Sequence, residues 1–151
     1  MITGGALWRR HLLGIIVCLL TMRVALAADR VVLIANSRNS VSELNSLEVQ
    51  KLFLGLTVYA GGSALHPLRN ESDQLLREIF YQDIISMSEL TYERRLLALT
   101  LQQGRTAPPI YKSSRQLVSA VASDSAAISF AWATEVANDP RIKVLRVVGQ
   151  E

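Results

Sequence analysis

Cysteine and histidine are almost absent from this 151-residue chain. Its one cysteine, Cys18, lies in an apolar run near the start, and its two histidines are His11 and His66. The lack of cysteine after this run excludes a disulfide framework and thiolate metal sites. A zinc site or a histidine-based catalytic triad is also not expected, because His66 is the one histidine beyond the first 27 residues. The sequence therefore predicts no metal, no cofactor and no enzymatic activity.

A hydrophobic run long enough to cross a bilayer is missing as well. The apolar stretch at 12–20 is too short for a comfortable transmembrane helix. It follows two arginines and precedes an Ala-Leu-Ala pattern that ends at Ala27, an order typical of a cleaved signal peptide. Residues 1–27 are therefore predicted to be a Sec-type signal peptide cleaved near Ala27. The remaining residues, 28–151, are predicted to be one periplasmic domain without a transmembrane segment.

The predicted mature chain has no excess of charge of either sign. The sequence contains 16 lysines and arginines, three of them in the first 27 residues, and all 13 acidic residues lie after that point. The formal charge of +3 therefore belongs to the predicted signal peptide. A neutral domain offers no basic surface for a nucleic acid, and no nucleic-acid partner is expected.

The chain does contain an alternation of strand-like and helix-like segments. Residues 30–35 are apolar and rich in β-branched side chains, as in a buried strand. Apolar residues then recur at helical spacing between a cap at Ser46 and a stop at Gly55. Further helices are expected to start near 72, 88 and 113 or 114, with extended segments at 65–68, 126–132 and 142–148. This order predicts an α/β fold with a mixed sheet and helices on both faces.

Two of the expected helices have further features. The second helix is expected to start near Ser72, with Ser72 and Asp73 at its positive end, where side-chain oxygens can accept hydrogen bonds from the free N–H groups. The third is expected to start near Ser88 and to place Leu90, Leu97 and Leu101 along one face.

The first helix also carries a resemblance to a known family. Asn36 ends the first strand, Leu-Glu-Val-Gln-Lys-Leu occupies 47–52, and Phe-Leu-Gly occupies 53–55. Matching segments follow in the same order, namely Arg77 with Phe80 and Tyr81, the loop at 104–109 and the strand at 126–130. The chain resembles phosphate-type periplasmic solute-binding proteins of ABC transporters. The resemblance implies one lobe of a type II periplasmic-binding-protein fold, a small oxyanion such as phosphate as ligand, and a membrane transporter or sensor as partner.

Two departures from the family pattern bear on function. Full-length members have two lobes, which need roughly twice this length, so the chain is predicted to be a short single-lobe member. In many members the second helix opens with Ser-Gly-Thr, which holds phosphate at the helix N-terminus. Aligned on Phe80, this chain has Gln74, Leu75 and Leu76 instead. The resemblance therefore supports the family more strongly than the family's ligand.

Five residues are candidate ligand groups. Arg69 and Ser72 precede the second helix, where a guanidinium, a hydroxyl and the positive end of the helix dipole would meet an anion. Asn36 and Ser37 lie in the loop that leaves the first strand, and open α/β sheets bind ligands at the carboxyl ends of their strands. The resemblance implies that Arg77 reaches the same cleft.

Each candidate also has a structural alternative. Residues 69–72 would then be an ordinary capped helix start with a solvated arginine, residues 36–40 a surface turn, and Arg77 part of an internal ion pair. A lone His66 is interpreted as a surface or half-buried polar residue. Two functions are left open by the sequence: weak binding of a small oxyanion within a transport or sensing system, and a periplasmic interaction or sensory module without phosphate binding.

Overall fold

The computed structural model describes residues 30–149, and the predicted signal peptide with its cleavage site lies outside the described residues. The elements in chain order are β1 (Val31–Asn36), α2 (Ser46–Phe53), β2 (Tyr59–Ala60), β3 (Ser63–Ala64), β4 (His66–Pro67), β5 (Arg69–Asn70), α3 (Gln74–Ile79), the π-helix η1 (Phe80–Ile84), α4 (Glu89–Gln103), β6 (Ile110–Tyr111), α5 (Ser114–Ser123), β7 (Ala127–Trp132), α6 (Ala133–Val136) and β8 (Ile142–Val147). Among these, no helix has both the length and the apolar composition needed to cross a membrane.

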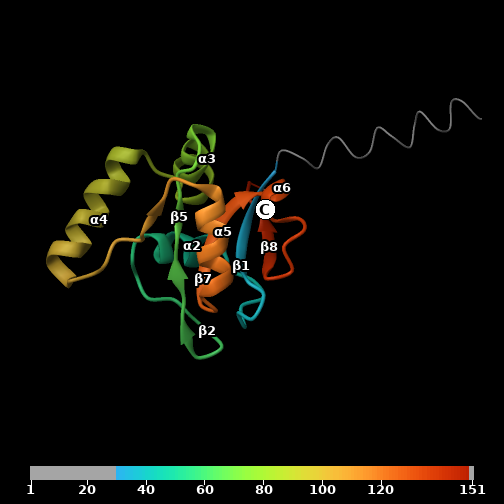
Figure 1. Cartoon of the computed structure of the whole chain (residues 1–151). Helices are drawn as coiled ribbons and strands as arrows, with labels where there is room; N and C mark the ends of the chain where they lie inside the picture. Colours follow the sequence, from blue (N-terminus) through green and yellow to red (C-terminus); the bar gives the residue numbers. More distant parts are fainter. Residues whose placement is uncertain (1–29, 150–151) are drawn as a thin grey trace, which may run out of the picture.

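A four-stranded sheet in the order β4-β7-β1-β8 forms the centre of the fold (Figure 1). β1 pairs antiparallel with both β7 and β8, while β4 pairs parallel with β7. All six residues of β1 are buried, as its continuous apolar run predicts. Two short ladders, β2–β3 and β5–β6, lie outside this sheet. The predicted α/β fold with a mixed sheet is therefore confirmed.

Helices cover both faces of the sheet. Leu33 and Ala35 of β1 belong to one hydrophobic core together with residues of α2, α3, η1 and α4. Val32 and Ile34 belong to a second core with residues of α5 and α6. This division follows from the strand geometry, because successive side chains of a strand point to opposite faces.

The first core is built around the ring of Phe80. Its centroid lies 5.4 Å from that of Phe53, 5.2 Å from Tyr81, and 5.3 Å from both Tyr92 and Phe130. The Phe80 and Phe130 rings are stacked, and the other three contacts are edge-to-face. Such pairs add about 0.5–1.5 kcal/mol each beyond burial. Most of the chain's few aromatic residues are thus concentrated in one cluster.

The first helix begins one residue earlier than the predicted cap implies. Asn45, not Ser46, is the N-cap: its side chain accepts a hydrogen bond from the Glu48 amide at 2.9 Å. The Glu48 carboxylate in turn accepts one from the Asn45 amide, which completes a capping box. Gly55, with φ of +76°, follows the last turn in the left-handed conformation that its predicted role as the stop requires.

The second helix, in contrast, begins later than predicted. Asp73 is the N-cap, and its carboxylate accepts a hydrogen bond from the Leu76 amide at 2.9 Å. Ser72 precedes this cap, and its amide donates to the side chain of Asn70 at 3.0 Å. Of the two residues predicted for this helix start, Ser72 and Asp73, the second is the cap.

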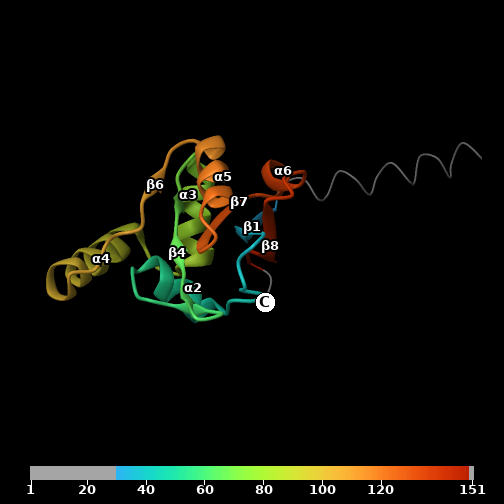
Figure 2. The same ribbon diagram turned by 60° about the horizontal axis from the view of Figure 1, so that its bottom comes forward.

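The leucine row of α4 does not pack against the sheet. Leu90, Leu97 and Leu101 share one face as predicted, but these residues are 60%, 58% and 76% exposed, respectively. Tyr92 and Leu96, on a different face, are the buried residues of this helix. The far end of α4 extends away from the sheet in both views (Figures 1 and 2).

The fourth predicted helix is confirmed as α5. Ser113 is its N-cap, and the Ser113 hydroxyl accepts a hydrogen bond from the Gln116 amide at 3.4 Å. Leu117 and Val121 face the second core, as their spacing predicts.

Replacing the α2 cap should measurably weaken the fold. Asn45→Ala should lower the free energy of unfolding by about 1 kcal/mol in urea titrations, because an amide of the first turn loses its acceptor. Ser46→Ala, which removes a hydroxyl from the first helical position, should cost less. A larger loss for Ser46→Ala than for Asn45→Ala would contradict the assigned cap.

Stability should fall at alkaline pH because of Tyr92. Burial raises the pKa of Tyr92 to about 12 against a smaller opposing effect of Arg69, and its hydroxyl donates to the Phe53 carbonyl at 2.6 Å. A tyrosine with a raised pKa stabilises the fold below its unfolded pKa of about 10 and loses that contribution as the pH rises toward 12. Unfolding free energies measured from pH 9 to 12 should fall accordingly, and less steeply in Tyr92→Phe. An identical pH dependence in both proteins would contradict this assignment.

Candidate functional site

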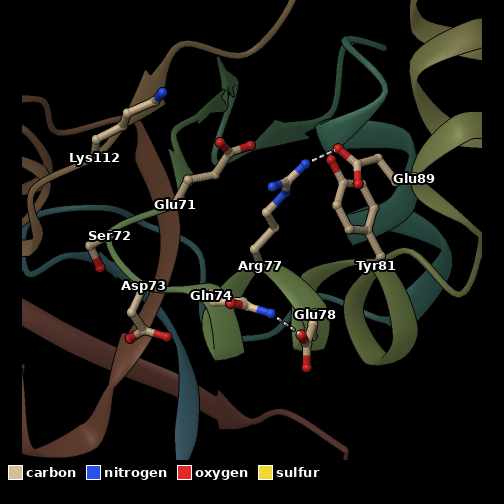
Figure 3. Close-up of a pocket in the computed structure, with 9 residues that line it drawn as sticks. All are labelled: Glu71, Ser72, Asp73, Gln74, Arg77, Glu78, Tyr81, Glu89 and Lys112. Atoms are coloured by element: carbon tan, nitrogen blue, oxygen red, sulfur yellow. Dashed lines mark hydrogen bonds and ion pairs between the residues drawn. The ribbon is translucent and has the colours of Figure 1, made fainter.

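The start of α3 borders an open cavity of about 550 Å³ (Figure 3). Its walls come from the segment between β5 and α3, from α3 and η1, from the first residue of α4, and from the residue after β6. Of the five predicted ligand residues, Ser72 and Arg77 line this cavity. Figure 3 shows the Arg77 side chain between Glu71 on one side and Glu89 and Tyr81 on the other.

Arg69 is buried behind this cavity and is only 5% exposed. Its Nε donates to Glu71 at 2.9 Å, its Nη1 donates to Glu93 at 3.0 Å, and its Nη2 also contacts Glu71. The guanidinium carbon lies 5.6 Å and 5.3 Å from the ring centroids of Phe80 and Tyr92. Burial acts to lower the pKa of Arg69, but the hydrogen bonds, with Glu71 foremost, outweigh it and raise the pKa. The guanidinium is therefore charged and enclosed by internal partners.

The N-terminus of α3 is already occupied by a carboxylate. Asp73 Oδ1 accepts from the Leu76 amide, and its Oδ2 accepts from Trp132 Nε1 at 2.7 Å. The preceding turn is fixed by Asn70, a buried residue whose side chain donates to the Phe130 carbonyl at 2.9 Å. An external anion at this helix start would displace Asp73 or lie beside it, and two negative groups at one helix end repel each other.

Arg77 forms an ion pair with Glu89 of α4, the alternative that the sequence left open for this residue. The two side chains are 46% and 48% exposed. The hydrogen bond with Glu89 is the main cause of a raised pKa of Arg77. A half-exposed pair of this kind contributes little to stability. The pair does, however, leave Arg77 with a carboxylate as its nearest charged partner.

The cavity has more negative than positive groups. Glu71, Asp73, Glu78 and Glu89 contribute carboxylates, whereas the cations that line it are Arg77 and Lys112. A phosphate dianion entering this space would be surrounded mainly by carboxylates. The charge pattern instead suits a surface that is solvated or that meets a cationic or mixed-charge partner.

The predicted residues of the first loop lie at the opposite edge of the sheet. Asn36 ends β1, whereas Trp132, whose side chain bonds Asp73, lies opposite the first residue of that strand, Val31. Six residues of extended chain separate the two edges by roughly 17 Å. The structure therefore brings Arg69, Ser72 and Arg77 to one edge and Asn36 and Ser37 to the other.

The side chain of Asn36 forms hydrogen bonds within the fold. It is buried, and its amide nitrogen donates to the carbonyls of Val121 and Ala122, both at 2.9 Å. Its side-chain oxygen accepts from the Arg38 amide at 2.9 Å. The Ser37 amide donates to the Arg141 carbonyl at 2.7 Å, while the residue itself is exposed. Asn36 thus ties the end of β1 to α5.

Sequence analysis did not identify the carboxylate partners of the arginines. Glu71 lies two residues after Arg69, and this pair has a local signal, because alternate residues of an extended segment point the same way. Glu93 and Glu89 come from α4, and Lys112 from the segment after β6. Their approach depends on how these elements pack, for which the sequence contains no local signal.

The fold is shared with solute-binding proteins of solved structure. No protein-family profile and no curated protein matches the chain. A putative phosphate ABC transporter substrate-binding protein from Clostridium perfringens, solved with bound phosphate, superposes with a TM-score of 0.59 at 18% identity over 80% of this chain and 45% of that one. An ABC-type phosphate transport receptor from Vibrio cholerae has a TM-score of 0.54 at 15% identity over 80% and 47% of the two chains. A possible phosphate-binding protein from Planctomyces limnophilus has a TM-score of 0.56 at 14% identity over 80% and 42%.

These similarities establish the fold and its extent. This chain spans less than half the length of each of the three proteins. All three are described as binding or transport proteins. The chain thus has an α/β fold like one lobe of a periplasmic solute-binding protein.

Proposed function

We propose that this chain is an exported, solute-binding-like domain that works as an interaction or sensory module and does not bind phosphate through Arg69 and Ser72. The observation that carries this proposal is the enclosure of Arg69. All three nitrogens of this guanidinium already donate to Glu71 or Glu93, and the group packs against two aromatic rings with only 5% of the residue exposed, so an incoming oxyanion does not reach it. Its role is to join β5 to α4 and η1.

The charges around the cavity support the same proposal. Two unit charges 4 Å apart interact by about 4 kcal/mol at an effective dielectric constant of 20. Four carboxylates line the space, one of them Asp73 at the helix start, against the two cations Arg77 and Lys112, and this excess of negative groups disfavours a phosphate dianion. Leu75 and Leu76 also lack the side-chain donors of the family's Ser-Gly-Thr pattern.

The exposed face of α4 supports an interaction role. Large apolar side chains exposed together on one helix face can mark a contact with another protein. Leu90, Leu97 and Leu101 are exposed in this way, with Arg94 between the first two, on a helix that extends away from the sheet. Within the proposal, this face contacts a membrane transporter or a sensor protein on the outer side of the membrane.

Binding of a small oxyanion, such as phosphate, is the second candidate. It is favoured by the structural similarity to proteins described as phosphate binders, one of them solved with phosphate. In this alternative, Arg77 would exchange Glu89 for the ligand, Ser72 would add a hydroxyl, and binding would be weak because one lobe cannot close around it.

Arg69 should be required for folding more than for binding. Arg69→Met leaves Glu71 and Glu93 without their cation, and breaking a largely buried pair in this way costs about 3 kcal/mol. Arg77→Met, which breaks the half-exposed pair with Glu89, should cost much less. Urea unfolding of both variants measures the difference, and equal losses would contradict the structural role of Arg69.

Thermal melts test whether an oxyanion binds at the edge of the sheet where α3 begins. Phosphate, sulfate and arsenate at 10 mM should leave the midpoint unchanged relative to sodium chloride of equal ionic strength. A ligand at a hundred times its dissociation constant would add about 2.7 kcal/mol and raise the midpoint by several degrees. Stabilisation that disappears in Ser72→Ala or Arg77→Ala would overturn the proposal in favour of the second candidate.

Photo-crosslinking tests the interaction role. Arg94 is exposed and lies one turn before Leu97, so a crosslinking residue at this position should capture a membrane protein in intact cells. The same residue at Arg115, exposed on α5, is the matched control and should capture none. The product should also vanish when Leu97 and Leu101 are changed to serine. A product that survives this change would contradict the proposed contact.

A further inference from the structure

A second cavity, of about 590 Å³, lies at the opposite edge of the sheet. Three segments that are distant in sequence form it: the loop at 38–40 after β1, the hairpin of β2 and β3 with the start of β4, and the turn at 124–126 between α5 and β7. In Figure 1 this is the lower end of the sheet, where β2 is labelled, whereas α3 lies at the upper end. The cavity is thus separate from the one that Arg77 lines.

The loop that forms one wall is held in place from several sides. The Asn39 amide donates to the Asn36 carbonyl at 3.0 Å, and the Val41 amide donates to Asn39 Oδ1 at 2.9 Å. Lys143 of β8 donates to the carbonyls of Asn39 and Val41. These bonds fix the loop before any ligand arrives, which reduces the entropy that binding would cost.

The hairpin approaches this loop closely enough to require glycine. Gly61 has φ of +57°, and a Cβ atom at this position would lie 2.1 Å from Ser40 Oγ. Both the left-handed conformation and the close approach exclude a side chain. The two walls are therefore packed against each other where they meet, and the cavity beside them is preformed.

Hydrogen-bond donors are in surplus in this cavity. Asn39 is 7% exposed, and its Nδ2 has no hydrogen-bond acceptor among residues 30–149. A buried donor without a partner costs about 1–3 kcal/mol. The exposed guanidinium of Arg38 likewise has no hydrogen bond or ion pair with another described residue. Hydroxyl groups of Ser40, Ser63 and Ser125 complete the polar lining.

The one carboxylate that lines the cavity is already satisfied. Asp124 Oδ2 lies 2.7 Å from His66 Nδ1, and its Oδ1 accepts from the Ala126 amide at 2.9 Å. Burial acts to raise the pKa of Asp124, but these hydrogen bonds outweigh it and lower the pKa. Asp124 therefore offers little to a cationic ligand, and the unpaired charge that lines the cavity is that of Arg38.

The size of the cavity points to an organic molecule. Small-molecule sites typically measure about 300–1,000 Å³, and this cavity lies within that range. An inorganic anion such as phosphate would fill only a small part of it. Ala60, Ala64, Leu65 and Ala126 provide apolar surface for a carbon chain beside the serine hydroxyls.

We propose that the cavity between Arg38, Asn39 and Ser125 binds a small hydroxylated carboxylic acid, such as a sugar acid. The carboxylate accepts two parallel hydrogen bonds from the Arg38 guanidinium, a geometry that arginine favours. The hydroxyl groups of the ligand exchange hydrogen bonds with the serines. This site goes beyond the proposed interaction role and does not depend on it.

An NMR titration of the uniformly ¹⁵N-labelled, exported protein tests the site with matched ligands. Gluconate should bind saturably at millimolar concentrations and shift the amide signals of Asn39, Gly61 and Ala126. Glucitol, which has the same carbon chain but no carboxylate, should cause no comparable shifts. Equal responses to gluconate and glucitol would overturn the assignment to a carboxylic acid.

Two arginine variants locate the ligand. Arg38→Gln should weaken gluconate binding at least tenfold while leaving the spectrum otherwise folded, because its side chain has no partner to lose. Arg115→Gln makes the same change of charge on α5 and should leave binding unaltered. Equal losses in both variants would indicate a general charge effect and would overturn the proposal.

Three further outcomes would also overturn it. These are no shifts with 50 mM gluconate, shifts centred on Arg77 and Lys112 in place of the loop, and competition by phosphate with equal affinity. Phosphate shifts that depend on Ser72 and Arg77 would instead count against the proposed function, so the failures of the two proposals are distinguishable.

Discussion

The pairing of β1 with strands on both of its sides is the constraint on which the rest of the structure depends. Its six residues are buried on both faces, so the strand is stable only if helices cover each face and both neighbours satisfy its backbone. β7 and β8, which supply those neighbours, lie about a hundred residues later in the chain. The chain between them must therefore return to this strand, and the two edges of the sheet, where the polar loops lie, are defined by its two ends.

The two edges differ in how their charges are satisfied. At the α3 edge, Arg69 and Arg77 have carboxylate partners from α4, so the arginines serve the packing of the domain. At the other edge, Lys143 fixes the loop after β1 through its backbone carbonyls. The Arg38 guanidinium in this loop has no partner among residues 30–149. Similarity of fold to phosphate-binding proteins therefore does not specify where, or whether, a ligand binds. The distribution of partners among the arginines is more informative than their positions in the sequence.

The sequence predicted those features that depend on local pattern. The apolar run of β1 and the i, i+4 pair of Leu117 and Val121 each indicate one buried arrangement, and both are observed. Caps were shifted by one residue, because Asn45 and Ser46 are both good cap residues and only the Glu48 side chain selects between them. Tertiary contacts could not be predicted: the hydrogen bond from Tyr92 to the Phe53 carbonyl fixes which face of α4 is buried, against the larger row of leucines. The same helix supplies Glu93, the second carboxylate partner of Arg69, so this part of the site could not be predicted from the sequence either.

The way α4 is anchored has a consequence for local stability. Its buried side chains, Tyr92 and Leu96, lie in the first half of the helix, and the second half ends at Gly104 without a buried residue. Isolated helices shorter than about 12–15 residues are marginal in water. The last two turns should therefore open and close independently of the sheet, with amide hydrogen exchange much faster than that of β1. Ordering of this end by a bound protein would couple recognition to a local folding transition, and the free energy of that transition would be subtracted from the affinity.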